Sequence, residues 1–304
     1  MNTTKITLFL TCYQQEPYIK EAVQSALAQD YSPLEILISD DCSSDRTFEI
    51  INEVCQDYDG PHEVIINQTK KNIGAANHTN ELIPLATGEL IVIGCGDDIF
   101  TPNRVSVIAE VWHKYKTPVI TSNAYRMTAD GNVTGVVRSK DDNADLTLEH
   151  FLEHIVNIAC YGATQAFEKK LFMEFGPMDT SWSPYNGDHI IPFWGLLSGG
   201  NSYIFEPLVY HRMAPKSDSW KNHSISTTQE ERNESVLTHH IAQCMYILHT
   251  LEKFIETNNL SSSDRYVNCK TILTGTLIRL NKQWIKTRNS IKLKGKQCQW
   301  VALE

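Results

Sequence analysis

Two adjacent carboxylates, Asp97 and Asp98, follow a short apolar segment, Leu90–Ile93, in the stretch LIVIGCGDDIFTPNRV. A run of Leu, Ile and Val of this length is typical of a strand buried on both faces. Open α/β sheets bind their ligands at the carboxyl ends of such strands. Mg²⁺ and Mn²⁺ prefer oxygen ligands and commonly take one or two protein carboxylates together with substrate phosphates. The pair is therefore a candidate metal site; the alternative is a solvated turn before a helix near Pro102.

A second carboxylate pair follows an earlier apolar segment. The segment over residues 34–38 ends in Asp40 and Asp41. Ser43, Ser44 and Asp45 come next and are candidate N-caps for a helix over residues 47–55. This loop also has two interpretations, a ligand site or only a turn with a helix cap.

Two more predicted strands flank this loop in the chain. A strand over residues 6–10 precedes an amphipathic helix that begins near Pro17, and a strand over 62–67 leads into the loop KKNIGAANHTN. Strands that alternate with helices predict a largely parallel sheet. The polar loops are then expected to meet at the carboxyl edge of that sheet.

As a set, in this order and spacing, these motifs resemble those of the family 2 glycosyltransferases, which have the GT-A fold. The resemblance covers roughly residues 5–212. The matching positions are Thr11, Tyr13 and Glu16 for the motif Thr-x-Tyr-Asn-x-Glu; Asp40, Asp41, Ser43 and Asp45 for Asp-Asp-Gly-Ser-x-Asp; Asn72, Gly74 and Asn80 for the Asn-x-Gly turn and the Asn after it; Ala86–Glu89, Asp97 and Asp98 for the metal strand and its motif; and Gly187 and Asp188 for Glu-Asp.

The resemblance implies a role for each matching position. The residues implied to bind the nucleotide of a nucleoside diphosphate sugar are Thr11, Cys12, Tyr13, Glu16, Asp41, Asn72, Gly74, Asn80 and Asp97. Asp41 is expected to accept the imide N–H of uracil, which favours UDP over purine donors. Asp98 is expected to hold Mn²⁺ or Mg²⁺ between the two phosphates, and Asp188 is the expected general base. One base and one direct displacement imply inversion at the anomeric carbon.

Several positions depart from the family pattern. Cys95 replaces the first carboxylate of the metal motif, and a soft thiol does not substitute for a hard oxygen ligand of Mg²⁺. Gly187 replaces the Glu before the base, and Ala214 stands where a His is usual. His211 and Arg212 lie just before that position and are candidate contacts of the diphosphate, although a strand histidine with a structural role is an equal alternative for His211.

Composition limits the class of protein. The net charge of −9 argues against general binding of nucleic acid, because phosphate backbones attract basic surfaces. The eight cysteines show no regular framework, and no signal peptide is evident, which favours reduced thiols and a cytoplasmic location. No apolar run approaches 18 residues.

The character of the chain changes after about residue 215. We expect a catalytic domain over 1–215, with a nucleotide-sugar half to about 100 and an acceptor half over 101–215. A helical appendage is expected over 216–304, with helices near 236–255 and 265–290. The basic tail with interleaved Trp is a candidate for peripheral contact with the inner face of a membrane; a solvated helix face is the equal alternative. The appendage is also a candidate surface for a homo-oligomer.

The sequence therefore predicts a Rossmann-like α/β fold of GT-A type, with a mixed, mostly parallel sheet flanked by helices and a C-terminal helical appendage. The leading function is an inverting, metal-dependent glycosyltransferase that uses a nucleoside diphosphate sugar, favouring UDP, and a hydroxyl of a glycan or lipid-linked acceptor in surface polysaccharide synthesis. The alternatives are a non-catalytic nucleotide- or glycan-binding relic of the same fold and a nucleotidyltransferase. The nucleotidyltransferase is disfavoured, because the loop after the first strand has neither Gly nor Arg. An oxidoreductase is disfavoured because no GxGxxG follows an early strand.

Overall fold

The computed structural model describes residues 4–138, 147–155, 161–182, 187–213 and 228–293. Contacts divide the chain into two compact units, one of residues 1–150 with 159–214 and one of residues 151–158 with 215–304. The domain boundary expected near residue 215 stays a prediction. None of the helices in the described ranges combines the length and the apolar composition that a membrane span requires.

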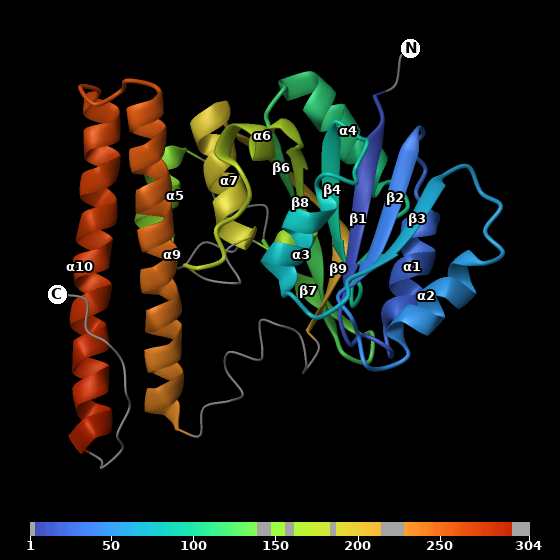
Figure 1. Cartoon of the computed structure of the whole chain (residues 1–304), viewed down its shortest axis with the longest axis horizontal. Helices are drawn as coiled ribbons and strands as arrows, with labels where there is room; N and C mark the ends of the chain where they lie inside the picture. Colours follow the sequence, from blue (N-terminus) through green and yellow to red (C-terminus); the bar gives the residue numbers. More distant parts are fainter. Residues whose placement is uncertain (1–3, 139–146, 156–160, 183–186, 214–227, 294–304) are drawn as a thin grey trace. The chain divides into compact units, whose positions relative to one another are not determined.

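The first unit is built on one nine-stranded sheet with the order β3-β2-β1-β4-β8-β6-β9-β5, and β7 pairs with β6. Figure 1 shows this sheet with its helices. The strands are β1 (Ile6–Cys12), β2 (Leu34–Asp40), β3 (Glu63–Gln68), β4 (Leu90–Cys95), β5 (Ile99–Phe100), β6 (Val119–Thr128), β7 (Val133–Val136), β8 (Gln165–Glu168) and β9 (Asn201–Met213). The helices of this unit are α1 (Ile19–Leu27), α2 (Thr47–Cys55), α3 (Ala75–Leu82), α4 (Arg104–Tyr115), the 3₁₀ turn η1 (Gly162–Thr164), α6 (Lys170–Phe175) and α7 (Gly187–Ser198), with α5 (Leu148–His154) at the division between units.

The sheet has the mixed, mostly parallel character that the sequence predicts. β3, β2, β1 and β4 form a continuous parallel ladder, so their carboxyl ends meet at one edge. β8 is antiparallel to both β4 and β6, and β9 then runs parallel to β6 and antiparallel to β5. Because β5 follows β4 directly in the chain, its pairing with β9 brings the end of β9 to the loop after β4. This pairing places residues near 211 beside Asp98.

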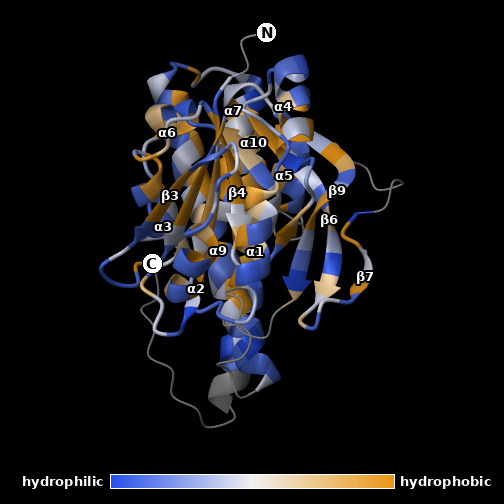
Figure 2. Ribbon diagram, turned by 90° about the vertical axis from the view of Figure 1, so that its right-hand side faces the viewer, coloured by the Kyte–Doolittle hydropathy of each residue, from blue (hydrophilic) through white to orange (hydrophobic). Residues whose placement is uncertain are grey.

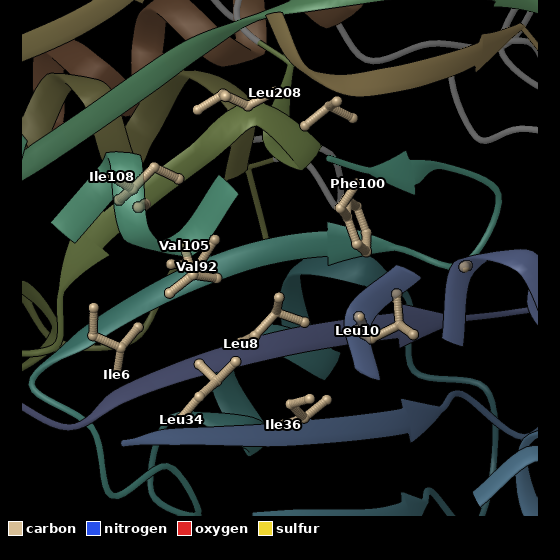
Figure 3. Close-up of a cluster of buried hydrophobic side chains, with 14 of the residues drawn as sticks. Ile6, Leu8, Leu10, Leu34, Ile36, Val92, Phe100, Val105, Ile108 and Leu208 are labelled. Atoms are coloured by element: carbon tan, nitrogen blue, oxygen red, sulfur yellow. The ribbon is translucent and has the colours of Figure 1, made fainter. Parts of the chain in front are cut away.

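The core explains why the central strands form where they do. Leu90, Ile91 and Val92 are fully buried, as expected for a strand covered on both faces. Figure 3 shows the apolar cluster in which Leu8 and Leu10 of β1 pack with residues of neighbouring strands and of α4. Each such side chain contributes about 1.5–3 kcal/mol by leaving water. In Figure 2 the central strands are hydrophobic along their length, which matches this burial.

The boundaries of the early elements follow the predicted ones closely. The helix α2 begins and ends at the predicted residues, and β1 extends two residues further than predicted, to Cys12. The helix α1 begins at Ile19 rather than Pro17, since a turn over residues 16–18 comes first. The helix near Pro102 begins at Arg104.

The second unit is a helical hairpin of α9 (Gln229–Thr257) and α10 (Asp264–Leu293). Thr228 and Glu231 form a capping box at the start of α9, which satisfies backbone N–H groups of its first turn. The helices bury Cys244, Ile247 and Leu251 of α9 and Cys269 and Leu273 of α10. Both helices cover the ranges that the sequence predicts. The final part of the basic tail, from residue 294, lies outside the described residues, as does Ala214.

Candidate active site

The carboxylate pair lies in a tight turn after β4 and is buried. Asp98 is 1% exposed and Asp97 is 8% exposed. The Asp98 backbone N–H donates to the Cys95 carbonyl at 3.1 Å, which closes the turn. The Cys95 sulfur and one carboxylate oxygen from each aspartate all lie within 4.8 Å of one another. The plain solvated turn is therefore excluded as the explanation of this pair.

Asp98 is held by β9. Its Oδ1 accepts the backbone N–H of Arg212 at 2.9 Å and lies 3.2 Å from the His211 Nδ1. The Asp97 carboxylate accepts its own backbone N–H, and no other residue in the described ranges donates a hydrogen bond to it. Burial and then the Asp98 charge raise the pKa of Asp97 to about 7. Two buried carboxylates that accept so few hydrogen bonds form a site that favours binding of a cation.

His211 is the imidazole that lies beside these carboxylates. Burial alone would lower the pKa of this imidazole, but the hydrogen bond to Asp98 and the charges of Asp98, Asp97 and Asp188 raise it. The Tyr161 ring lies against the imidazole, with ring centroids 4.6 Å apart. The sequence left His211 either as a contact of the diphosphate or as a structural strand histidine, and in the structure it lies near Asp98, Asp97 and Asp188.

The Cys95 thiol does not add a ligand for a hard cation. Burial and the neighbouring charges of Asp98, Asp97 and Asp188 raise its pKa well above the ordinary value, so it stays protonated. A neutral thiol is a poor ligand, and even a thiolate is soft. The oxygen donors of Asp97 and Asp98 therefore fit Mn²⁺ or Mg²⁺, while Cys95 is a neighbour of that site.

Asp188 lies in the first turn of α7 and faces the same cluster. Burial raises its pKa to about 6, while the His211 charge and a hydrogen bond from the Gly162 N–H oppose that rise. Gly162 approaches so closely that a Cβ there would lie 2.5 Å from the Asp188 Oδ1. The side chain of Gln165 donates to the Asp188 backbone carbonyl at 2.7 Å. A carboxylate that exchanges its proton near pH 6 is suited to act as a general base.

The carboxylates after β2 are held differently. Asp41 is buried and accepts hydrogen bonds from Thr69 Oγ1 at 2.9 Å, from the Ile73 N–H at 3.0 Å and from the Gly74 N–H at 2.8 Å. The Ile73 N–H also lies 3.2 Å from the second carboxylate oxygen, so three donors hold a carboxylate that offers about four acceptor positions. Asp41 thus fixes the turn over residues 69–74 that contains two other predicted contacts, Asn72 and Gly74.

Asp40 and Glu16 join loops to one another. Asp40 accepts the backbone N–H and the hydroxyl of Ser43 and, at 2.9 Å, the side-chain amide of Gln68. The Glu16 N–H donates to Asp45 at 3.2 Å, and its carboxylate accepts the Arg46 N–H at 3.1 Å. The loops after β1 and β2 are therefore bound together by these side chains.

Two departures from the family pattern coincide with left-handed backbone. Gln14 has φ of 51° and Cys42 has φ of 58°. Asn and Gly, the family's residues at these positions, tolerate this conformation better than other residues. Gln14 is fixed in place by Ser43 and Ser44, which accept its backbone N–H at 2.8 Å and its side-chain amide at 3.1 Å.

The other predicted nucleotide contacts are spread along this edge. Thr11 Oγ1 donates to the Gly94 carbonyl at 3.3 Å, Cys12 is buried with its thiol toward the Leu10 carbonyl, Tyr13 is half-buried, and Asn72 is exposed. The Asn80 side chain donates to the Met178 carbonyl and accepts the Met178 N–H, both at 2.9 Å. In this structure its amide thus connects α3 to the segment before α7.

Arg212 is engaged within the protein. Its guanidinium donates to the Asp97 carbonyl at 2.9 Å, to the Ala129 carbonyl at 3.0 Å and to Glu21 at 2.7 Å, and it stacks over Tyr18. The side chain is only 4% exposed. Arg212 therefore holds the turn at Asp97 in place. A diphosphate would have to displace one of these partners to contact the Arg212 guanidinium.

Sequence reasoning missed two parts of this site. One is the turn from Tyr161 to Gln165, which contacts both His211 and Asp188. The other is Arg104, which is fully buried at the start of α4. A signal for Arg104 was present, because it shares a four-residue spacing with Ile108 and Trp112 on the apolar stripe of that helix. The turn around Gly162 carries no comparable pattern.

Known proteins share both sequence and fold with this chain. The sequence model of Glycosyl transferase family 2 matches residues 7–175. A relative from Escherichia coli, the UDP-Glc:alpha-D-GlcNAc-diphosphoundecaprenol beta-1,3-glucosyltransferase WfaP, is 29% identical over 156 residues, which is 51% of this chain and 58% of the relative's own length.

Solved structures agree on the fold. Residues 1–349 of S. aureus TarS, in complex with UDP-GlcNAc, superimpose with a TM-score of 0.58 at 16% identity, over 91% of this chain and 81% of that TarS chain. The mannosyltransferase PcManGT from Pyrobaculum calidifontis, in complex with GDP-Man and Mn²⁺, has a TM-score of 0.53 at 15% identity, over 92% of this chain and 86% of PcManGT. These likenesses confirm the predicted GT-A type fold.

Proposed function

We propose a donor, a metal and a set of catalytic groups for this chain, which belongs to glycosyl transferase family 2 and is a glycosyltransferase. The proposed reaction moves a sugar from UDP to a hydroxyl of a glycan or lipid-linked acceptor, with inversion at the anomeric carbon. The observation that carries this proposal is the arrangement of Asp97, Asp98 and Asp188 around His211. It joins a cation site and a candidate base in one cluster.

The residues proposed to hold the metal are Asp98 and Asp97. When bound, Mn²⁺ or Mg²⁺ would offset the charge that develops on the leaving diphosphate. Asp98 is well placed for this role because the Arg212 N–H orients one of its oxygens. The presence of Mn²⁺ beside GDP-Man in PcManGT is consistent with this choice of metal.

Asp188 is proposed to take the proton from the attacking hydroxyl. Its raised pKa, about 6, leaves it deprotonated at neutral pH yet basic enough to accept a proton. The Gly162 N–H orients the carboxylate, and His211, whose pKa the neighbouring aspartates raise, lies in the same cluster. The proton moves from the acceptor oxygen to Asp188 as that oxygen attacks, so one displacement inverts the anomeric centre.

The proposed nucleotide pocket lies along the ends of β1, β2 and β3. Asp41 would accept the uracil imide N–H at its remaining position, with Thr11, Cys12, Tyr13, Glu16, Asn72, Gly74 and Asn80 along the same edge. The preference for UDP is supported by the TarS complex with UDP-GlcNAc and by the name of WfaP, a UDP-Glc enzyme. The name of WfaP also specifies a lipid diphosphate acceptor, which supports the proposed acceptor class.

A donor-hydrolysis screen tests this proposal. UDP, GDP and dTDP sugars are each incubated with the full chain in the presence and absence of Mn²⁺, and release of the nucleoside diphosphate is measured. We expect release from one or more UDP sugars only with Mn²⁺. Equal release without metal would contradict the assignment of Asp98, and a preference for GDP sugars would contradict that of Asp41.

The alternative of a non-catalytic relic has one observation in its favour, which is the neutral thiol of Cys95 at a carboxylate position of the metal motif. The same screen separates the two functions. A relic would bind UDP and release no diphosphate from any donor.

A further inference from the structure

Arg104 is a fully buried cation that no proposed step uses. It begins α4, and one terminal nitrogen of its guanidinium donates to two backbone carbonyls, that of Ile93 at 2.5 Å and that of Ala163 at 2.6 Å. The guanidinium also lies over the Phe100 ring, 4.8 Å from its centroid. Its position is therefore fixed from three sides, by β4, η1 and β5.

Structural stability alone does not explain this residue. The Arg104 Nε and its other terminal nitrogen are buried with no hydrogen-bond partner among the described residues. Burial lowers the pKa of Arg104 to about 10, so the group stays charged at neutral pH, with the charge of Asp98 among those that favour its charged form. Buried ionic groups are often no more stabilising than apolar side chains of similar volume. The charge of Arg104 and its two unpaired nitrogens therefore point to a role at the site rather than in stability alone.

The two carbonyls that Arg104 joins belong to the two halves of the site. Ile93 lies on β4, two residues before Cys95, in the strand that leads to Asp97 and Asp98. Ala163 lies in η1 next to Gly162, whose N–H donates to Asp188. The same turn begins with Tyr161, which packs on His211.

We propose that Arg104 is a positioning residue that ties η1 to β4 and so fixes the general base Asp188 relative to the carboxylates Asp97 and Asp98. This inference rests on the proposed function. The two N–H bonds of one nitrogen hold two backbone segments about 70 residues apart in the chain. Without them, the nearest attachment of Gly162 to β4 is the pairing of Ala166 with Val92, four residues along the chain, so the Gly162 N–H can shift relative to Asp188. The carboxylate pair stays on β4 and keeps its contacts with β9.

The test compares Arg104→Met and Arg104→Lys with Ile108→Val, a control on the same buried stripe of α4 that does not contact η1 by hydrogen bond. UDP affinity with Mn²⁺ is measured by calorimetry, and kcat by hydrolysis of the donor that the screen identifies. A base displaced by about 1 Å loses about 100-fold in rate, so we expect that loss in kcat for Arg104→Met, with UDP affinity unchanged. Arg104→Lys keeps a cationic donor and should recover part of kcat. Ile108→Val should retain native kcat and affinity.

Gly162→Ala gives the same test from the side of the base, and it decides the matter if Arg104→Met does not fold. The added Cβ would lie 2.5 Å from the Asp188 Oδ1 and must displace that carboxylate. The expected result is again a loss of kcat at unchanged UDP affinity. Native kcat in Arg104→Met or in Gly162→Ala, or a parallel loss of kcat and UDP affinity in both, would overturn the inference while leaving the proposed function intact. Failure of the proposed function is distinguished by the native chain, which would then release no diphosphate.

Discussion

Two carboxylate pairs follow parallel strands of the same sheet, and they differ in the hydrogen bonds that they accept. After β2, Asp40 and Asp41 each accept hydrogen bonds from several neutral donors, at residue 43 and at residues 68–74. After β4, Asp98 receives one backbone N–H and the His211 imidazole, and Asp97 receives only its own N–H within the described residues. Both pairs are buried. The number of internal hydrogen-bond donors therefore distinguishes the two pairs. The pair after β2 holds loops together, and the pair after β4 is suited to bind a cation.

The site after β4 also contains carboxyl groups whose pKa values lie near neutral pH. The cluster after β4 contains Asp97 and Asp188, whose pKa values burial raises to about 7 and about 6. Groups that change protonation near neutral pH cluster at functional sites, because few structural contacts require such a change. Variants at the cluster after β4 should therefore change chemistry, and variants after β2 should change nucleotide binding or stability.

The largest effect is expected for Asp188→Asn, which keeps the size of the side chain and removes its basicity. Loss of a general base reduces rates by about 10²–10⁴. A group that acts only in the transition state leaves ground-state binding unchanged, so UDP affinity should stay native. The measurement is donor hydrolysis alongside calorimetry with UDP and Mn²⁺. Asp179→Asn is the matched control, and native hydrolysis by Asp188→Asn with a loss in Asp179→Asn would assign the base to Asp179.

The next effect concerns the pair after β2. Asp41→Ala removes the proposed acceptor of the uracil N–H and the side chain that holds the turn over residues 69–74. It should weaken UDP binding by roughly 1.5–3 kcal/mol. The loss should be the same with and without Mn²⁺, because Asp41 holds no metal. Thr69→Val is the control, since it removes one donor to Asp41 and leaves the carboxylate in place. Unchanged UDP affinity in Asp41→Ala would show that uracil binds at another position.

A smaller effect is expected from pH. Asp188 must be deprotonated to act, and its raised pKa means that it keeps its proton up to about pH 6. At saturating Mn²⁺, kcat for donor hydrolysis should therefore fall about tenfold for each unit below pH 6 and level off above it. The residual hydrolysis of Asp188→Asn should lack this acidic limb. If kcat of that variant still falls below pH 6, the fall belongs to another titratable group. Asp97 and His211 are the nearest ones.

The smallest effect is expected at Cys42, next to the carboxylate pair after β2. Its φ of 58° is unfavourable for a residue with a Cβ, so Cys42→Gly should stabilise the chain by roughly 0.5–1 kcal/mol after the entropic penalty of glycine. Thermal unfolding measures this change. Cys42→Ala retains the Cβ and should show no gain, and an equal gain in both variants would assign the effect to the thiol.

The predictable parts of this structure are those set by local pattern. The alternation of apolar segments and caps predicted the parallel ladder from β3 to β4, and α2 has the predicted bounds. The order and spacing of the motifs predicted the family and the GT-A type fold, both of which the comparisons confirm. The roles of the individual site residues stay predictions.

The contacts that assemble the site were not predictable, because they join distant residues. His211 meets Asp98 through the pairing of β5 with β9, and Arg104 meets Ala163 across the core. Neither contact leaves a periodic trace in the chain. The internal donors that occupy Asp40 and Asp41 likewise depend on loops from other strands. The sequence therefore predicted different roles for the two carboxylate pairs but not the internal contacts that hold each of them.

The most direct test of the account is the affinity of the native chain for UDP with and without Mn²⁺, measured by calorimetry and repeated with Asp98→Asn. The asparagine can still accept the Arg212 N–H, so the turn after β4 should keep its fold. The account predicts that Mn²⁺ strengthens UDP binding to the native chain and has no effect on binding to Asp98→Asn. Equal affinity of the native chain with and without Mn²⁺ would contradict it.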